Sequence, residues 1–184
     1  MRVYDYLKKV REAAPLVHHI TNWVTIGDCA DIVKTLGASP VMAHAEEEAA
    51  EMTGLASALV LNIGTLTSAL VRAMIRAGKA ANEKGIPVVL DVCGAGATPF
   101  RNESVRSIFE SVSVRVIKGN ASEIASVAGE NARTRVVDSG EVEGNLEEIA
   151  RSLAVDKKAV VVVTGRDDIV TDGRKARMVS NGHE

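Results

Sequence analysis

Aromatic residues and cysteines are both scarce in this sequence. Phe, Trp and Tyr make up only 3% of its 184 residues. The core therefore has to be built from Val, Ala, Ile and Leu, a composition typical of buried parallel sheets. The two cysteines, Cys29 and Cys93, are too few for a disulfide framework. We therefore expect a protein of the reducing cytoplasm.

Three further absences exclude other classes of protein. The formal net charge is only −2, which leaves no electrostatic footprint for nucleic acid or for an anionic membrane. The start of the chain, Met1-Arg-Val-Tyr-Asp5, lacks the apolar core of a signal peptide. No apolar run approaches the roughly 20 residues that span a bilayer. We expect neither nucleic acid nor a membrane as a partner of this chain.

The apolar pattern that is present predicts alternating helices and strands within one domain, since a chain of this length can bury about 70% of its unfolded surface. Helices are expected over residues 3–14, 46–53, 67–84, 102–111 and 146–155. A further helix is expected between a cap at Thr21 or Asn22 and Gly37, and another opens at residues 119–123. Strands are expected at 16–20, 40–43, 58–63, 87–91, 114–118 and 159–163. This alternation predicts an α/β fold, a three-layer α/β/α sandwich with a mostly parallel sheet.

The last third of the sequence departs from this regular pattern. Periodicity fails between Glu130 and Gly144, which predicts an exposed loop or a small edge excursion before a helix capped by Asn145. Further on, residues 169–171 and 174–179 flank Asp172-Gly173, a pair typical of a hairpin with a type I′ turn. The sheet is therefore expected to become antiparallel near its end.

The stretch from Pro87 to Pro99 combines a buried strand with a glycine turn. The strand ends on Asp91, and Gly94 and Gly96 follow at once. Ligands of open α/β sheets bind at the carboxyl ends of the strands. The glycine N–H groups could receive an anion there, and Asp91 could hold a divalent metal. The alternative is that the glycines supply only positive φ angles and that Asp91 only caps the turn.

Other predicted strands also end in polar groups. These ends are His19 to Asn22, Asn62 to Thr65, Lys118 to Glu123, and Thr164-Gly165. In a parallel sheet they share one edge, which favours a binding site there. Asn120 and Glu123 have the spacing of a capping box, whereas the functional interpretation has Glu123 holding Mg²⁺ through water near phosphates that Lys118 neutralises.

Several other interpretations have less support from the sequence. There is no G-x-x-x-x-G-K-[ST] motif, and the Gly94–Gly96 turn lacks the third glycine of a dinucleotide-binding loop. Adjacent strand residues such as His18 and His19 point to opposite faces and cannot share one metal, so a satisfied core histidine beside one at the rim is expected. Nothing near Cys93 marks a thiolate, so we expect a buried spectator. Met42 could line a pocket or fill the core.

Taken together, five motifs resemble those of the hydroxyethylthiazole kinase family. They are His19-Ile-Thr21-Asn22-x-Val24-Thr25, Gly37-Ala-Ser39-Pro40-x-Met42, Leu61-Asn62-Ile-Gly64-Thr65-Leu66, Asp91-x-x-Gly94-Ala-Gly96-Ala-Thr98 and Ile117-Lys118-Gly119-Asn120-Ala-Ser-Glu123-Ile124. They occur in order and cover essentially the whole chain. The resemblance implies a ribokinase-like fold and the ATP-dependent phosphorylation of 4-methyl-5-(2-hydroxyethyl)thiazole in thiamine salvage.

The resemblance also implies roles for individual residues. The thiazole would be contacted by Asn22, Met42, Gly64 and Thr65. The nucleotide would be bound by Lys118, Asn120, Thr164, Gly94 and Gly96. Asp91 and Glu123 would be the catalytic acids that organise Mg²⁺ beside the phosphates. The family is typically a homotrimer with active sites between subunits, so we expect the same assembly here.

Two departures from the family pattern leave rival functions open. The family's usual Asp-Pro-Val-Gly is Asp91-Val-Cys93-Gly94 here. In addition, no segment in residues 1–184 matches the glycine-rich turn and helix that supply the family's anion hole and the residue that activates the hydroxyl. A single domain incomplete at its C-terminus is therefore expected. The rivals are a non-catalytic module that binds thiazole or nucleotide, and another ribokinase-like enzyme such as a hydroxymethylpyrimidine kinase.

Overall fold

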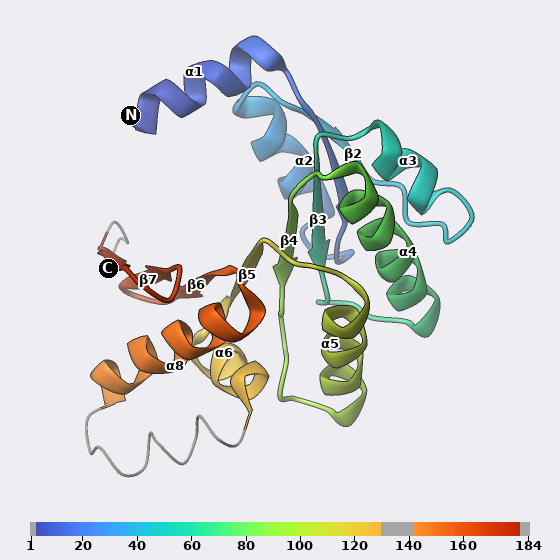
Figure 1. The fold of residues 1–184 in the computed structure, drawn as a ribbon. Helices are drawn as coiled ribbons and strands as arrows, with labels where there is room; N and C mark the ends of the chain where they lie inside the picture. Colours follow the sequence, from blue (N-terminus) through green and yellow to red (C-terminus); the bar gives the residue numbers. More distant parts are fainter. Residues whose placement is uncertain (1–2, 130–141, 181–184) are drawn as a thin grey trace. The chain divides into compact units, whose positions relative to one another are not determined.

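The computed structural model describes residues 3–129 and 142–180. The chain divides into two compact units, Met1–Val88 and Val89–Glu184. Each unit is an α/β layer structure in its own right (Figure 1). Within the described residues, no helix is sufficiently long and apolar to cross a bilayer.

The first unit is built on three parallel strands. They are β1 (Leu16–Ile20), β2 (Ser39–Val41) and β3 (Ala58–Asn62), in the spatial order β2-β1-β3. Its helices are α1 (Val3–Ala13), α2 (Ile26–Thr35), α3 (Ala49–Leu55) and α4 (Ser68–Lys84). Figure 1 shows α2 on one face of these strands and α3 with α4 on the other. Helices on both faces confirm the expected layers.

Small side chains on α4 let this helix pack tightly in the first unit. Its inward face carries Ala73, Met74, Ala77 and Ala81, all fully buried. The helix begins where the Thr67 side chain accepts a hydrogen bond from the Leu70 N–H at 3.1 Å. It ends at Gly85, whose φ of 77° suits a left-handed C-cap. Both ends agree with the sequence-based expectation.

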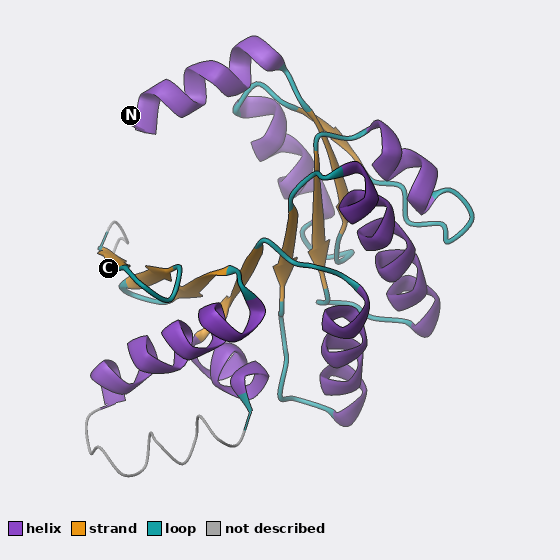
Figure 2. Ribbon diagram, in the orientation of Figure 1, coloured by secondary structure: helices purple, strands orange, loops and turns teal. Residues whose placement is uncertain are grey.

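The second unit contains a mixed sheet with the order β4-β5-β6-β7-β8. Its strands are β4 (Val88–Asp91), β5 (Val116–Asn120), β6 (Val160–Thr164), β7 (Asp168–Thr171) and β8 (Ala176–Val179). The first three are parallel, whereas β7 and β8 are antiparallel to their neighbours, as expected. The helices are α5 (Pro99–Ser111), α6 (Ala121–Ala128) and α8 (Val142–Lys157), and Figure 2 shows α6 and α8 on the same side of the later strands.

Two local expectations for the second unit were wrong. Asn145 lies inside α8, which begins at Val142, so it is not the residue that caps this helix. The hairpin has a four-residue loop, 172–175, because Thr171 pairs with Ala176. The Asp172 carboxylate accepts hydrogen bonds from the N–H groups of Arg174 and Lys175 and shapes this loop. A type I′ turn requires positive φ angles at both Asp172 and Gly173, and only Gly173 has one. The loop expected between 130 and 144 falls mostly outside the described residues.

Candidate active site

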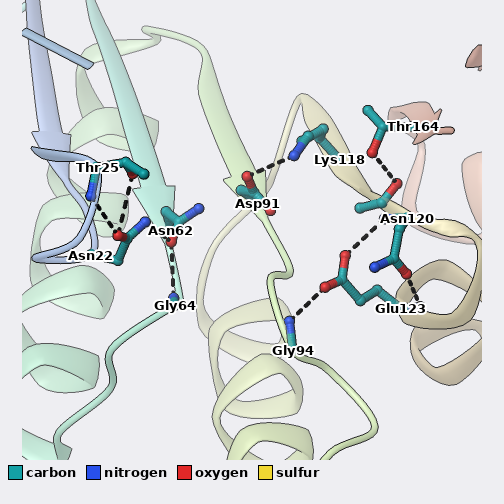
Figure 3. Close-up of polar contacts among 11 residues, drawn as sticks. Asn22, Thr25, Asn62, Gly64, Asp91, Gly94, Lys118, Asn120, Glu123 and Thr164 are labelled. Carbon is teal, nitrogen blue, oxygen red and sulfur yellow. Dashed lines mark hydrogen bonds and ion pairs between the residues drawn. The ribbon is translucent and has the colours of Figure 1, made fainter. Parts of the chain in front are cut away.

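A first polar cluster lies at the ends of β1 and β3, and Asn22 is its centre (Figure 3). Its Oδ1 accepts hydrogen bonds from the backbone N–H groups of Val24 and Thr25, both at 3.0 Å, and from the Thr25 hydroxyl at 3.2 Å. Its Nδ2 donates to Asn62 Oδ1 at 3.0 Å. Asn22 is only 8% exposed. The side chain therefore fixes the turn that leads into α2.

Gly64 continues this cluster from the loop after β3. Its N–H donates to Asn62 Oδ1 at 2.9 Å. A Cβ atom at position 64 would lie only 2.7 Å from Asn22 Cβ and 2.9 Å from Asn62 Oδ1. The next residue, Thr65, accepts a hydrogen bond from the Trp23 N–H through Oγ1 at 3.1 Å. Three of the four residues expected to contact the thiazole are thus brought together, with no space for a side chain at Gly64.

Met42, the fourth of these residues, directly follows β2, which pairs with β1. Its carbonyl oxygen lies 3.1 Å from Nδ1 of His44. The Nε2 atom of His44 lies 3.2 Å from the backbone of Thr21. Met42 is therefore connected to the Asn22 turn through a histidine that the sequence did not single out.

A second polar cluster lies at the ends of β4 and β5 in the other unit (Figure 3). Asp91 and Lys118 stand opposite each other in the strand register, and Asp91 Oδ2 accepts a hydrogen bond from Lys118 Nζ at 3.0 Å. The other carboxylate oxygen, Oδ1, is buried without a hydrogen-bond partner among the described residues. A buried oxygen in this state requires an explanation, because leaving it unpaired is costly.

Glu123 and Asn120 form the capping box that their spacing predicts. Asn120 Oδ1 accepts a hydrogen bond from the Glu123 N–H at 2.9 Å, and Glu123 Oε2 accepts one from the Asn120 N–H at 2.7 Å. The remaining oxygen, Oε1, accepts a hydrogen bond from the Gly94 N–H at 2.7 Å. Glu123 therefore stabilises both the start of α6 and the glycine turn after β4.

Gly94 and Gly96 adopt positive φ angles of 74° and 92°, so the turn requires glycine conformations at both positions. Gly96 donates its N–H to Asn102 Oδ1 at 2.7 Å. Both glycine N–H groups expected to receive an anion thus donate to side chains of the protein. The turn function is observed, and a role in nucleotide binding stays a prediction.

Thr164 lies at the end of β6, in register with Asn120 on β5. Its hydroxyl donates to the Gly119 carbonyl at 3.3 Å. This contact brings a third strand end to the cluster, as the topology of a parallel sheet predicts.

Arg101 is a further residue of this cluster that was not predicted from the sequence. Its Nη1 donates to the Cys93 carbonyl at 2.8 Å, and a Cβ atom on Gly94 would lie 2.9 Å from the same nitrogen. Its position in the first turn of α5, three residues after the N-cap Thr98, was the available signal. The guanidinium adds a second positive charge to a turn where only Lys118 was expected.

Of the two histidines and Cys93, only His18 has the surroundings that the sequence predicted, since Cys93 was expected to be buried and is only half-buried. His18 is fully buried and hydrogen bonded to Thr53 and to Ala43, so it is the satisfied core histidine. His19 is only 6% exposed, and neither ring nitrogen has a hydrogen-bond partner among the described residues, so its expected place at the rim was wrong. Burial lowers the pKa of both rings and raises the pKa of the Cys93 thiol, which opposes a thiolate.

The second cluster has a donor set that suits magnesium. Proteins commonly bind Mg²⁺ through one or two carboxylates together with substrate phosphates. The unpartnered Asp91 Oδ1 fits this requirement. Both Glu123 oxygens already accept an N–H, which suits contact through water. Within the described residues, no three His, Cys, Asp or Glu side chains form an all-protein cage.

Comparison with solved structures first defines the class of fold. An adenosine kinase from Trypanosoma brucei brucei matches with a TM-score of 0.57 at 12% identity, over 96% of this chain and 65% of that one. At this identity the likeness shows the fold alone, which is the ribokinase-like α/β fold.

More similar proteins define the family. The hydroxyethylthiazole kinase family model matches residues 7–184. A hydroxyethylthiazole kinase from Methanosarcina mazei is 56% identical over 178 residues, which are 97% of this chain and 68% of the relative. The structure of a hydroxyethylthiazole kinase protein from Pyrococcus horikoshii OT3 has a TM-score of 0.87 at 46% identity, over 97% of this chain and 66% of that one. The chain belongs to the hydroxyethylthiazole kinase family and spans about two thirds of these relatives' length.

Proposed function

We propose that this protein transfers the γ-phosphoryl group of ATP to the hydroxyl of 4-methyl-5-(2-hydroxyethyl)thiazole. The observation that carries the proposal is the Asp91–Lys118 pair, in which one carboxylate oxygen accepts from Lys118 and the other lacks a partner among the described residues. Family membership supports this acceptor, because relatives that are 56% and 53% identical are hydroxyethylthiazole kinases.

The first cluster would bind the acceptor. A thiazole alcohol is neutral, so its recognition requires shape and hydrogen bonds rather than charge. The proposed contacts are the polar side chains of Asn22 and Thr65, the flexible apolar side chain of Met42, and the backbone of Gly64, which has no side chain. The Asn22 side-chain amide and the Gly64 N–H both donate to Asn62 Oδ1, and these hydrogen bonds keep the surface rigid. Rigidity lowers the entropic cost of binding a small ligand.

The second cluster would handle the phosphates. Phosphoryl transfer needs in-line positioning and neutralisation of charge more than covalent chemistry. Lys118 would offset phosphate charge, while Asn120, Thr164 and the Gly94–Gly96 turn would position the nucleotide. When bound, Mg²⁺ would neutralise the phosphate oxygens, and Asp91 would hold it directly, with Glu123 acting through water. The acceptor oxygen would then bond to the γ-phosphorus as the bond to the β–γ bridging oxygen breaks, which leaves ADP, and the hydroxyl proton would be released to solvent.

The resemblance to the family extends the proposal to assembly and location. We propose a homotrimer in the cytoplasm, and sedimentation of the purified protein measures the assembly directly. A trimer would also agree with the exposed apolar side chains Trp23 and Val24, which are 60% and 81% exposed.

The test is an acceptor comparison with purified protein, ATP and Mg²⁺. We expect ADP release and a phosphorylated product with the thiazole alcohol, and little of either with a hydroxymethylpyrimidine. Transfer to the pyrimidine alone would contradict the assigned acceptor. Calorimetric binding of the thiazole without any ADP release would instead favour a binding module.

A further inference from the structure

The imidazole of His44 connects two loops of the first cluster. The Nδ1 atom lies 3.1 Å from the Met42 carbonyl oxygen, and Nε2 lies 3.2 Å from both the backbone nitrogen and the carbonyl oxygen of Thr21. With the proton on Nδ1, the neutral ring makes two hydrogen bonds, because Nδ1–H donates to Met42 and Nε2 accepts from the Thr21 N–H. With the proton on Nε2, it makes only one, to the Thr21 carbonyl, and the geometry therefore favours the Nδ1–H tautomer. One ring therefore links the residue after β2 to the backbone immediately before Asn22.

Trp23 supports this ring from its face. The two ring centroids are 4.8 Å apart, and the planes are inclined by 27°, which is a stacked arrangement. The backbone of Trp23 is itself fixed, since its N–H donates to Thr65 Oγ1 at 3.1 Å. The stack and these hydrogen bonds join the loops after β1, β2 and β3.

Ala43, the residue between Met42 and His44, is fixed by a second histidine. His18 Nε2 donates to the Ala43 carbonyl at 2.9 Å, and its Nδ1 lies 2.8 Å from the buried hydroxyl of Thr53. His18 thus attaches the Met42 segment to the core and to α3. The role of His44 differs, because its Nε2 atom contacts the backbone of Thr21, next to the Asn22 turn, and not the core.

We propose that His44, as its Nδ1–H tautomer, is a positioning residue that sets Met42 against the Asn22 turn and so determines affinity for the acceptor. The inference rests on the proposed function, in which these loops bind the thiazole. His44 acts through the backbone of Met42 and Thr21, so it affects the acceptor and leaves the nucleotide unaffected. Its loss should change binding of the thiazole far more than the rate of phosphoryl transfer.

The test compares H44F and H44N in the full chain. Phenylalanine retains a ring for the stack with Trp23 but has neither hydrogen bond. Asparagine retains a donor near the position of Nδ1 but lacks the acceptor for Thr21. Lys79, exposed on α4, supplies the control K79Q. Calorimetry measures Kd for the thiazole without nucleotide, and steady-state assays give KM for both substrates and kcat.

We expect H44F to raise the Kd and KM for the thiazole about tenfold, the effect of one or two lost hydrogen bonds. H44N should lie between H44F and the wild type, and KM for ATP should stay within about twofold in every variant. Equal thiazole affinity in H44F and wild type would overturn the inference, and so would a matching rise in KM for ATP. Wild-type protein that binds no thiazole would overturn the proposed function itself.

A spectroscopic measurement keeps the inference falsifiable should H44F fold poorly. The ¹⁵N shifts of labelled histidine distinguish the two neutral tautomers, and H44N identifies the His44 signals by their loss. We expect Nδ1 protonated and Nε2 unprotonated at neutral pH. The Nε2–H tautomer at this residue would overturn the inference, because that ring cannot donate to the Met42 carbonyl.

Discussion

The two polar clusters differ in charge. In the first unit, Asn22, Asn62 and Thr65 are neutral, and their side chains make hydrogen bonds within and between the loops that follow β1 and β3. In the second unit, Asp91, Lys118 and Glu123 are charged. The contrast matches the two ligands of the proposed reaction, because a neutral alcohol needs fixed shape and a polyphosphate needs charge neutralisation.

The clusters also differ in how completely their polar atoms are paired. Asn22 Oδ1 accepts hydrogen bonds from three donors. Asp91 Oδ1, by contrast, is buried with no hydrogen-bond partner among the described residues. A side chain whose polar atoms are all hydrogen bonded holds its loop in one conformation, whereas an unpaired carboxylate oxygen can bind a cation. Substitutions in one cluster should therefore affect a different kinetic constant from substitutions in the other.

The largest effect is expected for D91N. The substitution removes the negative charge that faces Lys118 and the oxygen proposed to hold Mg²⁺, so kcat should fall by about 10²–10³-fold, the magnitude of losing one electrostatic contact to a transition state. Steady-state assays over a range of Mg²⁺ concentrations check this. The control D156N changes an exposed aspartate of α8 and should retain the wild-type rate. A D91N enzyme with normal turnover would contradict the role of Asp91.

E123A should have the next largest effect. Two backbone N–H groups, on Gly94 and Asn120, lose their acceptor, which should lower the free energy of unfolding by about 1–3 kcal/mol. Turnover and Mg²⁺ affinity should also fall, while binding of the thiazole stays nearly intact. T67A removes a helix cap that involves no carboxylate and should cost about 1 kcal/mol. Should E123A lose stability but keep its turnover, Glu123 would be only a cap.

G64A tests the neutral cluster. The added Cβ would lie 2.7 Å from Asn22 Cβ, so the Asn22 turn has to shift, at a cost of about 1–3 kcal/mol in stability. Affinity for the thiazole should fall about tenfold, with KM for ATP unchanged. The matched control is G54A in α3, where an added Cβ meets no atom within 4 Å. That substitution should be neutral or slightly stabilising, and an equal loss in both variants would argue against crowding at Gly64.

The smallest effect is expected at His19. Burial lowers its pKa, with a further contribution from His18, so the folded state binds fewer protons than the unfolded state below about pH 6.5. Stability should therefore be full above that pH and decline as the pH falls toward the lowered pKa. H19L removes a buried ring that has no hydrogen-bond partner among the described residues and should stay within about 1 kcal/mol of wild type at pH 8. Thermal unfolding as a function of pH should show a shallower acid decline in H19L than in wild type.

Much of the fold could be predicted from short apolar runs and from glycines. The run Leu16–Ile20 and the helix closed by Gly85 were found because burial and positive φ leave clear local signals. The predicted two-residue hairpin turn was wrong because the Asp172 carboxylate accepts hydrogen bonds from the N–H groups of the two residues after Gly173, so the loop is longer than the Asp-Gly pair indicates. The prediction that Asn145 caps the following helix was wrong because α8 already begins at Val142.

The candidate site was predictable where a residue acts through its own strand or helix. The capping box of Asn120 and Glu123 is a local pattern, and Asp91 follows from the end of a buried strand. His44 and Arg101 were missed because their partners, Thr21 and Cys93, are brought near by folding rather than by spacing. The spacing of His18 and His19 separated their faces correctly but could not show that both would be buried.

Calorimetric titration of the thiazole alcohol into D91N, without nucleotide, tests the division of roles most directly. We expect a Kd within about twofold of the wild-type value, because the neutral cluster proposed to bind the acceptor is intact in this variant. Loss of thiazole binding in D91N would contradict the division between a neutral acceptor cluster and a charged phosphate cluster.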